Sequence, residues 1–280
     1  MSDFVQREQV TCRFDSADGW VVLTPIEQSI KRKIEAIGTP LKDWDINIYR
    51  GVLTGCNEAF IINTDKRNEI LSNCQSEEER TRTEALIRPI LRGRDIKRYG
   101  YDWAGLYVIE ARLITNIPVN YPAVCKHLEQ YRQKGKLGDN STTKVFHRPW
   151  WAWMQEPVNY WEDFSKPKLL YADITEKLNF CLCKEELFCN NTAYFITSEN
   201  EKVLENLHSF LNTSVADWYY KTLSVQLGEK AVRMFSVYVL EIPVPLVSDK
   251  NIYDVLGLTH DEIKYIEMYQ RVSSSLDNSL

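Results

Sequence analysis

The feature that most constrains this chain is a short basic segment, residues 87–99, in which charged residues alternate with bulky apolar ones. It holds four arginines and one lysine around a single glycine, Gly93. Charged groups at this density are costly to bury, so one edge of the segment must face water. The other edge is expected to be anchored in a core by four apolar side chains: Ile87, Ile90, Leu91 and Ile96.

The cations of this segment are the strongest DNA-contact candidates in the sequence. Arginine makes bidentate contacts with phosphate or with the edge of guanine. An ordinary solvated loop has the same composition, and phosphate and base contacts use the same side chains. We therefore expect one cation to neutralise phosphate and another to read a base, without assigning which. The candidates are Arg92, Arg94, Lys97 and Arg98.

The charge of the chain is unevenly distributed. The formal net charge is −5, which by itself argues against a DNA-binding protein. Residues 80–148, however, contain fourteen Lys and Arg against six Asp and Glu, a local balance of +8 that leaves −13 for the remainder. An asymmetry of this size is typical of a basic surface on one face.

Length and composition are those of a globular protein of one large domain or two modest ones. The sequence contains no run of eighteen apolar residues, so no membrane span is predicted. Its first ten residues lack the apolar core of a signal peptide. Seven cysteines, an odd number without a secretory signal, indicate reduced intracellular thiols. We therefore expect a cytoplasmic protein.

The patterning predicts a mixed α+β fold, with curved, largely antiparallel strands in one or more sheets and flanking helices. Thr24-Pro25-Ile26-Glu27 is a helix start, and isoleucines at helical spacing continue it to Ile37. Thr259-His-Asp-Glu262 is a capping box that begins a last helix ending near Val272. Further helices are expected over residues 120–132, from 200 to 211 and through 218–219, and strands over 104–109, 167–183 and 192–197.

A hairpin is expected between residues 46–53 and 59–62, with Thr54 and Gly55 at its tip. Its turn could place backbone amides and short side chains against a phosphate or a base edge. An ordinary tight turn is the better interpretation from the residues alone.

Four motifs in order give the chain a family resemblance: Gly51–Asn63 (GVLTGCNEAFIIN), the basic segment, Trp150–Pro157 (WWAWMQEP), and Tyr160–Ile174 with its Lys166-Pro167-Lys168. Together they resemble the C-terminal specificity domain of TaqI-like DNA adenine methyltransferases and type IIG restriction–modification enzymes. The resemblance covers roughly residues 20–245. Leu211–Ser214, Trp218–Lys221 and Leu240–Pro245 also match a pattern shared with type I specificity subunits.

The resemblance implies a target recognition domain over residues 20–245 that reads duplex DNA and presents it to a methyltransferase or nuclease module in cis or in trans. It leaves residues 1–19 as a tether and 246–280 as a C-terminal helical extension. S-adenosylmethionine and magnesium are expected only in those catalytic modules, with no cofactor in this chain. The family match also makes Thr54 and Asn57 contact candidates.

Other cations have two interpretations each. Lys134, Lys136 and Lys144 lie in a glycine-containing basic loop that either closes over a phosphate backbone or is simply solvated. Arg148 precedes a tryptophan cluster that we assign mainly to packing, and Arg148 itself is kept as a contact candidate. Strand alternation would put Lys166 and Lys168 on one face, which gives modest support for a contact by Lys168.

Cys181, Cys183 and Cys189 suggest zinc, but C-x-C spacing on a strand favours a buried face over a four-ligand site. An Asp…Glu-x-Lys nuclease centre on Asp254, Glu262 and Lys264 is rejected, because two of them lie inside the capped last helix.

An Asn-Pro-Pro-Tyr-like loop and a glycine-rich methyl-donor turn are both absent from the sequence, so no catalysis is expected from this chain alone. Two other classes stay open. One is an interaction or scaffold domain whose basic face binds an acidic partner. The other is a self-contained enzyme.

Overall fold

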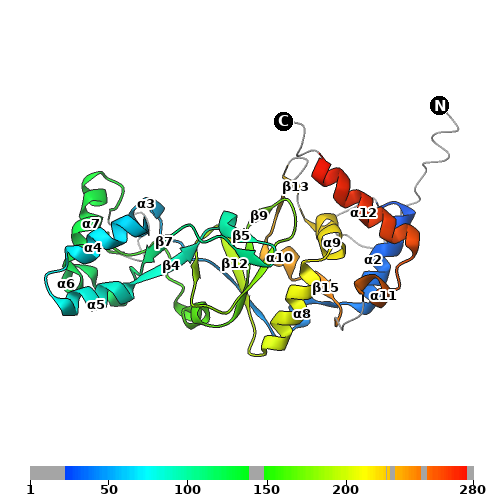
Figure 1. Cartoon of the computed structure of the whole chain (residues 1–280), viewed down its shortest axis with the longest axis horizontal. Coiled ribbons are helices and arrows are strands. Elements are labelled where there is room, and N and C mark those ends of the chain that lie inside the picture. The colour runs from blue at the N-terminus through cyan, green and yellow to red at the C-terminus, as the bar shows by residue number, and fades with distance from the viewer. Residues whose placement is uncertain (1–22, 139–147, 225, 228–230, 247–250, 276–280) are drawn as a thin grey trace. The chain divides into compact units, whose positions relative to one another are not determined.

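The computed structural model describes residues 23–138, 148–224, 226–227, 231–246 and 251–275 (Figure 1). The described residues form a mixed α+β fold with small, mostly antiparallel sheets, as predicted. They divide into two compact units. The central unit comprises Asn47–Ile174 and Asn179–Leu204, and the terminal unit comprises the described residues of Met1–Ile46, Thr175–Leu178 and Glu205–Leu280. The predicted tether, residues 1–19, lies outside the described residues, and the single specificity domain over 20–245 stays a prediction.

The central unit contains two four-stranded sheets. The first is fully antiparallel in the order β10-β8-β12-β2. The second has the order β11-β4-β7-β3, and in it only β11 pairs parallel, with β4. The strands are β2 (Asn47–Arg50), β3 (Ile61–Asn63), β4 (Ile87–Leu91), β7 (Leu106–Ile109), β8 (Lys168–Ala172), β10 (Phe180–Cys183), β11 (Phe188–Cys189) and β12 (Ala193–Thr197). A two-stranded hairpin, β5 (Ile96–Lys97) and β6 (Gly100–Tyr101), joins β4 to β7.

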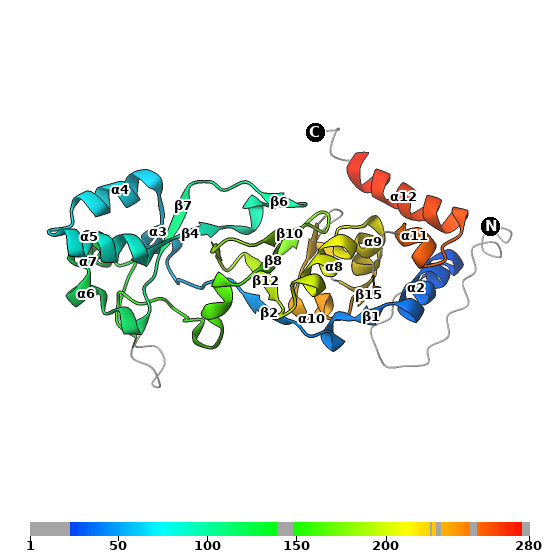
Figure 2. The same ribbon diagram turned by 60° about the horizontal axis from the view of Figure 1, so that its bottom comes forward.

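Five helices lie beside β4 and β7 (Figures 1 and 2). They are α3 (Asn57–Phe60), α4 (Thr64–Ser72), α5 (Glu77–Leu86), α6 (Ile117–Asn120) and α7 (Pro122–Gln133). The α7 helix confirms the predicted helix after residue 120, with Pro122 in its first turn. The buried carboxylate of Glu79 accepts a hydrogen bond of 3.0 Å from the backbone N–H of Ala123, satisfying a free donor at the start of α7.

The core of the central unit is rich in aromatic rings. Phe164 stacks on Phe188 at 4.6 Å between ring centroids and lies 4.7 Å from the ring of Phe195. Trp151 and Trp153 are buried in the same core, which confirms that they serve packing. Cys181, Cys183 and Cys189 are also buried in it, confirming the predicted buried strand face.

The terminal unit is mainly helical. Its helices are α2 (Pro25–Ile37), the larger part of α8 (Glu201–Leu211), α9 (Ser214–Leu223), α10 (Ser236–Val239), α11 (Ile252–Val255) and α12 (His260–Ser275). Its short strands are β1 (Thr39–Pro40), β13 (Gln226–Leu227), β14 (Ala231–Arg233) and β15 (Pro243–Val244); β1 pairs with β15 and β13 with β14. Short β9 (Ile174–Thr175) lies at the sequence boundary between the units. The α2 helix begins as predicted after Thr24, which forms a capping box with Glu27, and its Ile30 and Ile34 pack in one core with Trp218 and Ile266.

The prediction of a hairpin over residues 46–62 is wrong. β2 pairs with β12, whereas β3 pairs with β7 in the other sheet. Gly55, at a φ of 82°, turns the chain into α3 in place of a returning strand. A Cβ at Gly51 would lie 2.1 Å from the carbonyl oxygen of Asn190, so the chain passes against residues far away in sequence. Alternating side chains alone carry no information about such a non-local partner.

Glu262 links the first and last helices of the terminal unit. Its carboxylate accepts hydrogen bonds from Ser29 Oγ and Lys33 Nζ on α2 and from the backbone N–H of Thr259, each at 2.7 Å. Burial raises the pKa of Glu262, but these donors outweigh burial and lower it to about 2. The Glu262 carboxylate therefore has a structural role, which agrees with the rejection of a nuclease centre at this residue.

Because the folded-state pKa of Glu262 lies below its ordinary value, its contribution to stability is present above pH 5 and is lost as the pH falls toward 2. Glu262→Gln should therefore lower the unfolding free energy by roughly 2 kcal/mol at pH 7 and flatten its fall below pH 5. Urea titrations at several pH values measure this. Glu267→Gln, at an exposed position of the same helix, is the control, and an equal effect from both substitutions would contradict the assignment.

Candidate nucleic-acid interface

The basic segment runs through β4, a 3₁₀ turn (Gly93–Asp95) and the β5–β6 hairpin. Ile87, Ile90, Leu91 and Ile96 are all buried, as the sequence predicts. Arg94, Lys97 and Arg98 are exposed. The segment is therefore a structured loop with an apolar inner edge and a cationic outer edge.

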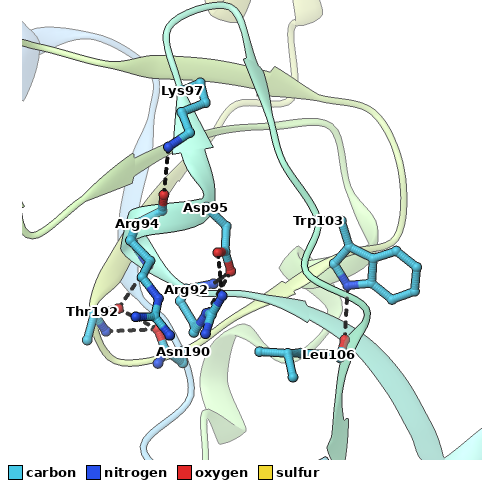
Figure 3. Close-up of polar contacts among 9 residues, drawn as sticks. Arg92, Arg94, Asp95, Lys97, Trp103, Leu106, Asn190 and Thr192 are labelled. Atoms are coloured by element: carbon cyan, nitrogen blue, oxygen red, sulfur yellow. Dashed lines mark hydrogen bonds and ion pairs between the residues drawn. The ribbon is translucent and has the colours of Figure 1, made fainter. Parts of the chain in front are cut away.

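Arg92 acts inside this loop. Its guanidinium donates two hydrogen bonds to the carboxylate of Asp95, at 2.9 and 2.7 Å, and its backbone N–H donates a third at 2.9 Å (Figure 3). Burial raises the pKa of Asp95, but the bonds from Arg92 outweigh it and hold that pKa below its usual value. A paired, half-buried arginine of this kind fixes the loop, so DNA contact would compete with an existing ion pair.

Gly93 docks the loop onto a second segment of the central unit. Its backbone N–H donates to Thr192 Oγ1 at 2.9 Å, and Thr192 Oγ1 donates to Asn190 Oδ1 at 2.6 Å (Figure 3). A Cβ at position 93 would lie 2.3 Å from the carbonyl oxygen of Thr192. Only glycine permits this approach, because the obstructing atom belongs to the backbone.

Arg94 and Lys97 lie on the exposed side of the loop. Lys97 Nζ donates to the carbonyl oxygen of Arg94 at 3.0 Å (Figure 3), which leaves its charge without a carboxylate partner among the described residues. Among the residues that the structure describes, no carboxylate forms an ion pair with the Arg94 guanidinium either. Arg98 lies at the hairpin tip, with its guanidinium 5.0 Å from the centre of the Tyr99 ring. All three cations are exposed.

Thr54 and Asn57 form a second, separate loop. Thr54 is buried, and its Oγ1 donates to Asn57 Oδ1 at 2.8 Å. Its carbonyl oxygen accepts from the backbone N–H of Met154 at 3.0 Å. Asn57 is exposed, whereas Thr54 is buried and shapes the turn.

The remaining predicted cations are mostly occupied. Lys136 pairs with Glu58, and Arg148 donates to the carbonyl oxygen of Trp153. Lys134 lies 5.6 Å from the centre of the Tyr131 ring. Lys144 lies outside the described residues.

The structure places Lys168 in the protein interior, with 0% of its surface exposed. Its ammonium group donates to the carbonyl oxygens of Phe164, Lys166 and Glu185, at 2.8, 3.2 and 3.0 Å. Burial lowers its pKa. Alternation does not put it beside Lys166, because Lys166 precedes the strand and reaches Glu199 at 2.8 Å. Lys168 in this position stabilises the start of β8, and we do not carry it into the interface.

Arg50 is a cation that the sequence reasoning passed over. It is exposed at the end of β2, and its Nε donates to the carbonyl oxygen of Asn191 at 3.1 Å. Asn191 adjoins Thr192, on which Gly93 docks, so Arg50 and the basic loop share one support. The only sequence signal was its place directly before Gly51 in the first family motif.

The described residues hold no cluster of three or more histidine, cysteine, aspartate or glutamate side chains arranged to bind a metal ion. None of their helices combines the length and the apolar character that crossing a membrane requires.

Comparison with known proteins gives one family. The sequence model of the TaqI-like C-terminal specificity domain matches residues 88–244. The fold is similar to that of the type IIG restriction endonuclease BpuSI, with a TM-score of 0.53 and 15% identity over 87% of this chain and 28% of that one. The type IIL restriction–modification enzyme MmeI in complex with DNA matches at a TM-score of 0.47 and 10% identity, over 83% of this chain and 29% of that one. The chain spans less than a third of either structure, and no curated protein matches it.

Asp95→Asn should weaken the loop, since the neutral amide loses the bidentate ion pair with Arg92 and leaves its guanidinium half-buried. We expect a fall of roughly 1–3 kcal/mol in unfolding free energy, measured by urea denaturation. Asp102→Asn, which neutralises an exposed carboxylate of the same hairpin region, should change it by less than about 0.5 kcal/mol. Equal stability of both variants would show that the Arg92–Asp95 pair does not hold the loop.

Proposed function

Because the chain belongs to the TaqI-like C-terminal specificity domain family, we propose that it binds duplex DNA sequence-specifically and supplies target recognition to a restriction–modification enzyme. The observation that carries the proposal is the basic loop over residues 92–98. It lies inside the matched region, is fixed by the Arg92–Asp95 ion pair, and presents its other cations to solvent. Fixing a loop before binding reduces the entropy lost on DNA association.

The accessible cations take the contacting roles. Arg94, Lys97 and Arg98 lie on the exposed edge of the loop, and Arg50 lies beside its support. Lysine and arginine at such positions neutralise phosphate, and arginine also reads guanine. Asn57, on the separate turn, has the amide group that pairs with adenine in the major groove. A net charge of −5 does not oppose this, because short-range contacts depend on the local surface.

The chemistry on DNA is assigned to another module, in cis or in trans. That module would bind S-adenosylmethionine, or magnesium for cleavage, and would flip an adenine out of the duplex for methylation. This chain's part is to hold the duplex in register, because contacts to phosphates and base edges fix the position of the target base.

Selection from a randomised duplex library, at low and near-physiological salt, tests the proposal. An enriched asymmetric motif of several base pairs supports it. Binding without enrichment would favour the competing hypothesis of a basic face for an acidic partner, since both show steep salt dependence and only one shows sequence preference. A methyl-transfer assay on the chain alone tests the third hypothesis, a self-contained enzyme.

Arg94→Gln should weaken DNA binding. Loss of a phosphate contact lowers affinity equally for all sequences and reduces the slope of log K against log salt by about 1, whereas loss of a guanine contact relaxes one position of the motif. Fluorescence anisotropy at several salt concentrations measures both effects. Lys184→Gln is the matched control, because this exposed cation is paired with Glu201 at 2.9 Å. Unchanged affinity in the Arg94 variant would remove the loop from the interface.

A further inference from the structure

The tip of the β5–β6 hairpin combines features that folding alone does not explain. Ile96 pairs with Tyr101 and Lys97 with Gly100, which leaves Arg98 and Tyr99 as a two-residue tip. Tyr99 has a φ of 69°, in the left-handed region that favours glycine or asparagine. The residue is also 62% exposed to solvent. The chain thus holds a large aromatic side chain where neither backbone conformation nor burial favours one.

The unfavourable backbone is held by a fixed base. Ile96 is buried, and the backbone N–H of Asp102 donates to the carbonyl oxygen of Asp95 at 2.8 Å. Asp95 is in turn held by Arg92, and Gly93 by Thr192. Strained residues that persist on a well-fixed support are typical of binding sites. The tip is therefore presented outward by a structure that pre-forms it.

The chemistry of the tip suits a base edge. The Arg98 guanidinium lies 5.0 Å from the centre of the Tyr99 ring, a distance at which the ring attracts and orients the cation. Lys97 directly precedes the pair and Arg94 lies in the 3₁₀ turn before β5, and both are exposed. An oriented guanidinium beside an aromatic ring offers a bidentate donor for guanine and an apolar surface for the methyl group of thymine.

We infer that the β5–β6 ribbon enters the major groove and that Arg98 and Tyr99 at its tip determine specificity at one or two adjacent base pairs. The inference rests on the proposed function and adds the reading residues to it. A two-stranded ribbon fits the width of the major groove, and its fixed base keeps the tip in register. Arg94 and Lys97 contact the flanking phosphates, and the Tyr99 ring packs on a base edge while it orients Arg98.

The test is Tyr99→Gly, assayed for stability and for sequence preference. Glycine relieves the left-handed backbone, so the melting temperature should rise by roughly 1–3 °C. Loss of the ring should lower affinity for the selected site roughly tenfold and relax only one or two adjacent positions of the motif. Tyr99→Phe, which keeps the ring, should retain the affinity and the motif. Ile114→Ser, at another exposed apolar position of the central unit, is the control and should change neither.

The outcomes separate the inference from the function beneath it. If the chain selects a motif and Tyr99→Gly keeps it at native affinity, or weakens every position equally, the tip does not read bases and only the inference fails. A fall in melting temperature would show that Tyr99 is needed for folding and would also overturn it. If no variant, nor the native chain, selects a motif, the proposed function fails and the inference with it.

Discussion

The ion pair between Arg92 and Asp95 is the constraint on which the candidate interface depends. It closes the 3₁₀ turn that follows β4, and this turn sets the direction in which β5 and β6 leave the sheet. The docking of Gly93 on Thr192 adds a support from a segment about a hundred residues later. Two charged side chains are thereby placed inside a cationic loop, where their contribution is to shape it. The remaining cations then stay at the surface in a fixed arrangement.

Local features of the fold follow well from the sequence. These features depend on residues close to each other in the sequence. They are the helix start of α2, the capping box of α12, the start of α7 and the buried isoleucines of the basic segment. Residues 46–62 are different, because β2 and β3 pair with strands about 45 to 145 residues away. The hairpin predicted there is therefore wrong. Periodicity reports which face of a strand is buried but not which strand covers it.

The same limit applies to the candidate site. The sequence identified the segment that carries the accessible cations, but it could not distinguish a contacting cation from a structural one. Arg92 is paired and Lys168 lies among three carbonyl oxygens in the interior, whereas Arg94 and Lys97 face solvent. What separates them is burial together with the acceptors around each group: the carboxylate of Asp95 for Arg92, and backbone carbonyl oxygens for Lys168. Arg50 was missed because its neighbour Asn191, which places it beside the support of the loop, is remote in sequence.

This sorting of cations bears on how the chain would bind DNA. The local excess of +8 over residues 80–148 overstates the charge available to phosphates, since several of those cations already have carboxylate partners, such as Arg88 with Glu186 and Lys136 with Glu58. Each neutralised phosphate contributes about 0.9 to the salt slope, so the few exposed cations of the loop predict modest affinity. A domain of this kind would position a duplex, and a second module would supply the further phosphate contacts for tight binding. The exposed, rigid tip then contributes selectivity more than strength, because base contacts discriminate between sites that share the same backbone.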